Sequence, residues 1–269
     1  MMVALIGAMV AGACPDVLDY GSWKPSISTA WDFRSDSATV IGAEHSRDPS
    51  HEQFGRIVSA FETARPTLAL FEGPDRGVAA SREETIRAGG ESALARLLAK
   101  SAGIPARSLE PSPSDQVKAL ARAFPQDQVM LFFVLREASR LRDREGLSGE
   151  KLDGAVSALL QRAAGIGPMP FEDFAGLDTA FRKYWPDRDW RTAEARWFDP
   201  LAEDAATGGK FFAAINRANS TNRNRHLVKL LANFAAKGER VFVVVGRNHV
   251  PMIAPALECA LAGPKTVGR

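Results

Sequence analysis

Two histidines and one glutamate occupy comparable places in this sequence, each shortly after a run of apolar residues. His45 and His249 each close a Gly-x-x-His sequence, and Glu72 directly follows a third apolar run. Two imidazoles and a carboxylate form a ligand set that catalytic divalent metals use while a further position stays open for water. His45, Glu72 and His249 are therefore predicted to be catalytic residues and ligands of one divalent metal, either Mn, Co or Zn.

The apolar runs that precede these residues predict strands. Ala38–Ile41 and Thr67–Phe71 are short and end at a glycine or a glutamate, and Val241–Val245 shows no polar alternation. An unbroken apolar strand is typical of a parallel sheet that helices cover on both faces. Ligands of open α/β sheets bind beyond the carboxyl ends of the strands. If these strands are parallel neighbours, the three side chains lie at one edge of the sheet.

Helices are predicted between these strands. Ser50 and Gln53 fit a capping box before an apolar stripe at helical spacing, and further helices are expected at Glu91–Lys100 and Arg223–Lys237. Val129–Leu135 is apolar throughout, so a strand and a buried helix remain alternatives. Strands alternate with helices at both ends of the chain. The sequence therefore predicts an α/β fold with a mostly parallel central sheet flanked by helices.

The domain organisation follows from composition. Residues 165–200 are rich in aromatic side chains, which predicts a helical, aromatic insertion packed by its own side chains; a lid or a substrate wall is the alternative. The chain shows no internal repeat and no low-complexity linker. Residues 15–269 are therefore expected to form a single α/β domain.

The first 14 residues are apolar and small, and they end at Cys14. Such a segment is typical of a signal peptide or a lipoprotein cleavage site, although no basic residue precedes it. It predicts an exported protein, either periplasmic or anchored to a membrane by a lipid on Cys14. A cytoplasmic protein in which the segment is a buried strand or helix is the alternative. No apolar stretch reaches the roughly 20 residues that a membrane-spanning helix needs.

The overall composition excludes several classes of function. The chain has 269 residues with 34 Lys and Arg against 32 Asp and Glu, and no basic run forms a patch for nucleic acid. Its two cysteines exclude a disulfide-rich scaffold and a cysteine-rich zinc module. Phosphate-binding loops and the Gly-x-Ser-x-Gly sequence of serine hydrolases are absent.

Four motifs, in this order, resemble those of the TraB/Tiki/GumN family, which is related to erythromycin-esterase and ChaN-like proteins. They are TVIGAEH at 39–45, LALFEG at 68–73, RNRHL at 223–227 and VVVGRNH at 243–249. The resemblance implies an α/β fold with its site at the strand ends, and a metal-dependent hydrolase, since Tiki proteins act as metallopeptidases. It also implies that His45, Glu72 and His249 are site residues, and it adds Arg223 as a catalytic arginine.

Arg223 is expected near the other three residues because it opens a predicted helix, whose start lies at the carboxyl edge of the strands. There it either holds Glu72 with two hydrogen bonds or stabilises an oxyanion. The expected substrate is a peptide or a small-molecule ester. One alternative is a ChaN-like haem or iron carrier without turnover, for which exposed Tyr or Met ligands would be needed. Another is metal-free hydrolysis, with a histidine as general base on water and Glu72 orienting it.

Overall fold

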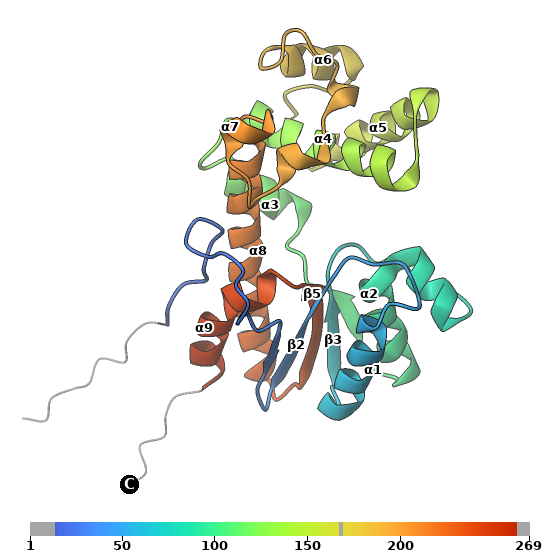
Figure 1. The fold of residues 1–269 in the computed structure, drawn as a ribbon, viewed down its shortest axis with the longest axis vertical. Coiled ribbons are helices and arrows are strands. Elements are labelled where there is room, and N and C mark those ends of the chain that lie inside the picture. Colours follow the sequence, from blue (N-terminus) through green and yellow to red (C-terminus); the bar gives the residue numbers. More distant parts are fainter. Residues whose placement is uncertain (1–13, 167–168, 263–269) are drawn as a thin grey trace, which may run out of the picture.

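The computed structural model describes residues 14–166 and 169–262, and within them five strands form one sheet in the order β1-β2-β5-β3-β4 (Figure 1). β1 runs antiparallel to β2, and the other neighbours are parallel. The α/β fold with a mostly parallel sheet is therefore confirmed. The strands are β1 (Asp32–Arg34), β2 (Ala38–Ala43), β3 (Leu68–Phe71), β4 (Ala106–Ser108) and β5 (Val241–Gly246).

The three predicted strands are neighbours, with β5 between β2 and β3. Their register pairs Ala43 with Gly246 and Phe71 with Val244, so all three end at the same edge of the sheet. β2 extends two residues beyond the predicted end, because Gly42 and Ala43 pair with β5 to its last residue. The residues that follow these strands are therefore delivered to one place.

Helices cover both faces of the sheet, which explains why its strands are apolar without alternation. Val40 and Val243 pack with α8 and α9 on one face, and Ile41 and Val244 pack with α1 and α2 on the other. The capping box predicted at Ser50 is wrong, because the Ser50 hydroxyl bonds to Asp48 and the helix starts later. These helices are α1 (Gln53–Ala64), α2 (Arg82–Ser101), α8 (Phe212–Ala235) and α9 (His249–Leu261).

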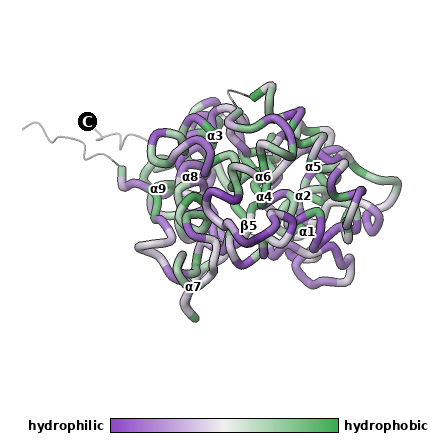
Figure 2. The backbone as a smooth tube through the Cα atoms, turned by 90° about the horizontal axis from the view of Figure 1, so that it is seen from above, coloured by the Kyte–Doolittle hydropathy of each residue, from purple (hydrophilic) through white to green (hydrophobic). Residues whose placement is uncertain are grey.

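A second, helical layer lies above the carboxyl edge of the sheet, and α8 runs from this layer down to the sheet (Figure 1). The ambiguous stretch Val129–Leu135 lies inside α4 and is helical. In Figure 2 hydrophobic segments lie around α4 and α6, near the middle of the molecule. The layer consists of α3 (Pro113–Leu120), α4 (Gln126–Glu145), α5 (Gly149–Ala164), α6 (Phe174–Arg182) and α7 (Asp204–Thr207).

The predicted aromatic insertion, as far as it is described, packs into this layer through its own aromatic side chains. Trp185 stacks against both Phe181 and Trp197, with ring centroids 4.9 and 5.2 Å away, and Trp190 is buried. Only short helical turns connect these residues, because bulky side chains rather than a regular backbone fill the space. The insertion is therefore part of a core, as expected.

Cys14 and Cys259 form a disulfide that joins the N-terminal segment to α9, with their Cα atoms 5.5 Å apart. A sulfur in a disulfide cannot also carry a thioether-linked lipid, so the structure corrects the prediction of a lipid anchor on Cys14. The rest of the predicted signal segment, residues 1–13, lies outside the described residues. None of the described helices is long and apolar enough to cross a membrane.

We expect Cys259→Ser to lower the free energy of unfolding by about 2–4 kcal/mol, because the disulfide closes a loop of 245 residues in the unfolded chain. Urea unfolding measures the loss. Reductant should cause a similar loss in the wild type and none in the variant. A wild type that is insensitive to reductant, or that has a free or acylated Cys14 by mass spectrometry, would contradict the pairing.

Candidate functional site

Three of the predicted site residues meet around Gly246, the last residue of β5. A methyl carbon placed on Gly246 would lie 3.2 Å from Glu72 Oε2, 3.5 Å from His45 Nε2 and 3.6 Å from His249 Cδ2. The glycine leaves that small space open. The side chain of His45 is half exposed, whereas those of Glu72 and His249 are largely buried. The structure thus brings together side chains from three parts of the chain, with one of them open to solvent.

Glu72 is held in place by Arg223 and by the sheet. Arg223 Nη2 donates to Glu72 Oε1 over 2.6 Å, and the Gly246 N–H donates to Glu72 Oε2 over 2.6 Å. Burial alone would raise the pKa of Glu72, but the charges of Arg223, His249 and His45 bring it well below its usual value. Glu72 is therefore an ionised carboxylate that faces both histidines.

Arg223 lies at the site, but for a different reason from the one predicted. It is in the middle of α8, which begins at Phe212, so the prediction that it opens a helix is wrong. The expected pair of hydrogen bonds goes to Glu110 instead of Glu72, from Nε over 2.7 Å and from Nη2 over 2.6 Å. Burial lowers the pKa of Arg223, but the negative charges of Glu72 and Glu110 raise it by more. The guanidinium therefore stays charged.

Glu110 is a site residue that the sequence reasoning missed. It follows β4 by two residues and accepts a hydrogen bond from the Gly73 N–H over 3.1 Å, besides those from Arg223. The available signal was the same one that selected Glu72, a carboxylate just after a strand. Because this strand has only three residues, its sequence pattern is weak, and Glu110 was not selected as a site residue.

Glu91 is a second missed residue, and it fixes His45. His45 Nδ1 lies 2.6 Å from Glu91 Oε1, and because a carboxylate accepts, Nδ1 carries the proton. In the neutral form of the ring, the lone pair of Nε2 is on the side of Gly246. The hydrogen bond to Glu91 raises the pKa of His45, against the opposing effect of burial.

Gly90 explains how Glu91 reaches His45. Its φ of 62° and ψ of −144° break α2, which resumes at Glu91. A methyl carbon on Gly90 would lie 2.7 Å from the Ser46 carbonyl oxygen, so only glycine allows this close approach. The pair Gly89-Gly90, directly before the helix predicted at Glu91–Lys100, was the signal for this break.

His249 is fixed in the same way by Asn224, a third residue that was missed. His249 Nδ1 lies 2.5 Å from Asn224 Oδ1, so Nδ1 donates and Nε2 keeps its lone pair. Nε2 lies 4.0 Å from Glu72 Oε1. Burial, together with the charge of Arg223, lowers the pKa of His249 to about 4, so the imidazole is neutral at pH 7.

The donor chemistry of this cluster suits a divalent metal, although no three His, Cys, Asp or Glu side chains of the described residues form a ready-made ligand group. In the neutral form of each histidine, Nε2 is unprotonated and Nδ1–H is fixed by an oxygen, as in metal-bound histidines. Each oxygen of Glu72 accepts one hydrogen bond and retains a second lone pair. His45, Glu72 and His249 could therefore hold a cation after a small adjustment.

The two tyrosines of the chain provide no exposed ligand of the kind that the haem or iron carrier would need. Tyr20 is buried and hydrogen-bonds to Asn248, and Tyr184 donates to Asp127 over 2.8 Å in the helical layer. Tyrosine at the crevice thus gives no support to that alternative.

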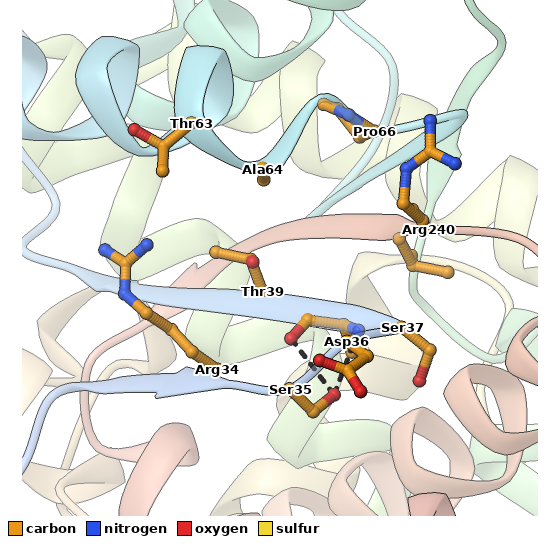
Figure 3. A pocket seen from close by; sticks show the side chains of 11 residues that line it. Arg34, Ser35, Asp36, Ser37, Thr39, Thr63, Ala64, Pro66 and Arg240 are labelled. Carbon is orange, nitrogen blue, oxygen red and sulfur yellow. Dashed lines mark hydrogen bonds between the residues drawn. The ribbon is translucent and has the colours of Figure 1, made fainter.

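Two cavities differ in chemistry. One of about 210 Å³ is lined by His45, Glu72 and Glu91 at the carboxyl edge of the sheet. Another, of about 260 Å³, lies at the amino ends of β2 and β5, where Figure 3 shows Arg34 and Arg240 on opposite sides of it. The second cavity is lined by no histidine and no glutamate. The first is therefore the candidate site.

Comparisons of this chain with protein-family models, with curated proteins and with solved structures find no match. The resemblance to the TraB/Tiki/GumN family thus depends on the four sequence motifs alone.

We expect Arg223→Met to destabilise the fold by about 3–5 kcal/mol, because it leaves two largely buried carboxylates without their cation. Arg225→Met is the matched control on the same helix. Its partner Asp16 is exposed, so the loss should stay below about 1 kcal/mol. Urea unfolding at neutral pH measures both. Equal losses would show that Arg223 does not balance buried charge.

Proposed function

We propose that this protein is a metal-dependent hydrolase of peptide or ester bonds, with its centre beside Gly246. One observation carries the proposal. Two histidines from distant segments have Nδ1 bonded to an acceptor and place their Nε2 edges beside the same ionised carboxylate. A histidine pair that serves only packing has no need of matched tautomers around an open space.

In the proposed reaction, His45, Glu72 and His249 hold the divalent cation. When bound, such a cation polarises the scissile carbonyl and lowers the pKa of a coordinated water towards ~7. Glu91 and Asn224 keep the imidazoles in the tautomer that leaves Nε2 unprotonated. The half-exposed His45 leaves a path for substrate from solvent.

Arg223 contributes in two ways. Its Nη2 keeps Glu72 ionised, while its Nη1 makes no hydrogen bond within the described residues. That free N–H group can donate to the oxyanion that forms when water attacks the carbonyl carbon. The charge of Arg223 is fixed by two carboxylates, so it is in place before the substrate arrives.

Metal-free hydrolysis is the second candidate, and one contact favours it. Glu91 holds His45 Nδ1 over 2.6 Å, an arrangement that orients a histidine as a general base on water. Glu91 takes the orienting role in place of Glu72, which the sequence reasoning had assigned to it. Activity that survives exhaustive dialysis against a chelator would favour this candidate.

We also propose that the protein is exported to the periplasm. The Cys14–Cys259 disulfide supports this location, because disulfides persist in oxidising compartments. Fractionation of the native host tests it, and recovery in the cytosol with Met1 retained would contradict it.

The direct test is metal analysis of protein purified without chelator, beside peptide and ester substrates with and without Mn²⁺, Co²⁺ or Zn²⁺. We expect about one metal per chain, lost in the double variant His45→Ala/His249→Ala. The control replaces the other two histidines, His51 and His226, which are not among the residues around Gly246. Full metal content in the first variant would place the site elsewhere, and a Soret band would indicate a haem carrier.

Gly246→Ala provides a subtler test of the same centre. The added methyl fills the space between the three ligands and should reduce both metal content and turnover by about tenfold or more, while strand β5 tolerates alanine. Gly55→Ala in α1 is the control, because a methyl there contacts nothing within 4 Å. Unchanged metal binding in Gly246→Ala would contradict the proposed position.

A further inference from the structure

The cavity beside the proposed centre has a positively charged wall. Besides His45 and Glu72, it is lined by three arginines that come from different elements. Arg76 lies in the loop after β3, Arg96 in α2 and Arg144 near the end of α4. The helical layer thus contributes to a cavity whose floor is the sheet edge.

Two of these arginines lack an acidic partner. Arg96 is paired with Asp75, whereas the side chains of Arg76 and Arg144 make no hydrogen bond or ion pair within the described residues. The two acids adjacent to Arg144 in sequence are already bonded elsewhere, Asp143 to Arg142 and Glu145 to Arg140 and Arg47. Arg76 and Arg144 therefore have no direct ion-pair partner within the described residues.

The carboxylates that line the cavity make their direct contacts with other groups, not with Arg76 or Arg144. Glu91 is bonded to His45, and Glu72 is bonded to Arg223. The guanidinium groups of Arg76 and Arg144 are thus free of direct ion pairs within the described residues and can take an added anion.

Both arginines are placed to reach a ligand in the cavity. The aliphatic part of Arg76 lies against Gly89, where an added methyl carbon would be 3.8 Å from its Cδ. Arg144 and His45 line the same cavity, from the end of α4 and from the loop after β2. A group bound between them would lie beside the proposed centre.

We infer that this cavity binds an anionic group of the substrate, a carboxylate or a phosphate, which Arg76 and Arg144 hold from opposite layers of the fold. The inference rests on the proposed hydrolase function, because the bound anion is part of a substrate only if the protein is a hydrolase. Guanidinium groups suit such anions because their planar donors match two oxygens at once. A volume of about 210 Å³ is below the roughly 300 Å³ of typical ligand pockets, so a small terminal group fits best.

The first experiment measures binding alone, so it does not depend on turnover. Glutarate, inorganic phosphate and the neutral glutaramide are titrated calorimetrically into the protein as purified. We expect one or both anions to bind and the diamide not to bind. The double variant Arg76→Gln/Arg144→Gln should weaken anion binding by about tenfold or more, since charge-assisted hydrogen bonds contribute about 1.5–3 kcal/mol each.

Arg162→Gln is the matched control, because Arg162 is an exposed arginine of α5 that does not line the cavity and has no ion pair within the described residues. It should leave the affinity within about twofold of wild type, as surface changes usually do. Equal affinity in wild type and in the Arg76/Arg144 double variant, or equal binding of glutaramide, would overturn the inference. Whichever anion binds more tightly identifies the group.

The second experiment compares turnover of two matched esters, the nitrophenyl half-ester of glutaric acid and the nitrophenyl ester of its amide. We expect a higher kcat/KM for the charged ester, and this preference should be lost in the double variant without loss of activity on the neutral ester. Equal rates for both esters would overturn the inference while leaving the hydrolase intact. If neither ester is cleaved but the anions bind through both arginines, the proposed function fails and the anion site remains.

Discussion

The ion pairs of Arg223 are the interaction on which the rest of the site depends. This guanidinium, with a side chain only 11% exposed, joins the middle of α8 to carboxylates at the ends of β3 and β4. Burying one cation between two anions is favourable only when the geometry satisfies all three groups. Here it fixes the position of α8 relative to the sheet, and α8 carries Asn224, which orients His249. One arginine thus sets the charge of Glu72 and the orientation of a neighbouring imidazole.

The second constraint on the site comes from two glycines, Gly246 and Gly90, because each leaves open a space that a side chain would fill. Gly246 ends the central strand β5 and leaves open the space that His45, Glu72 and His249 surround. Gly90 breaks α2 where its backbone passes the Ser46 carbonyl oxygen, and this break places Glu91 against His45. Because β5 lies between β2 and β3, a single strand end is within reach of all three side chains. Sheet order and two glycines together account for the convergence.

The sequence predicted the parts of this arrangement that depend on local pattern. Unbroken apolar strands implied a covered parallel sheet, and a parallel sheet implied a common edge for His45, Glu72 and His249. The partners Glu91, Glu110 and Asn224 depend on how elements pack, so periodicity does not select them among the many polar residues of the chain. The position of Arg223 at the site was predicted correctly but for a wrong reason. Its helix does not begin at the sheet edge; it extends beyond that edge into the helical layer, which the apolar pattern did not predict. For the same reason the partner of Cys14 could not be read from its neighbours.

The sheet edge and the elements around it contribute different kinds of charged group to the site. The sheet edge supplies groups that ion pairs hold in place, such as Glu72 with Arg223, and such contacts make a rigid, preorganised centre. The groups left unpaired, Arg76 and Arg144, lie on a loop and at the end of α4, away from the sheet ladder. Unpaired charge is costly in a core but inexpensive at a solvent-facing rim, where water screens it until a ligand arrives. In this arrangement a change in the loop or in α4 can alter which substrate is selected, while the hydrogen bonds of the centre stay intact.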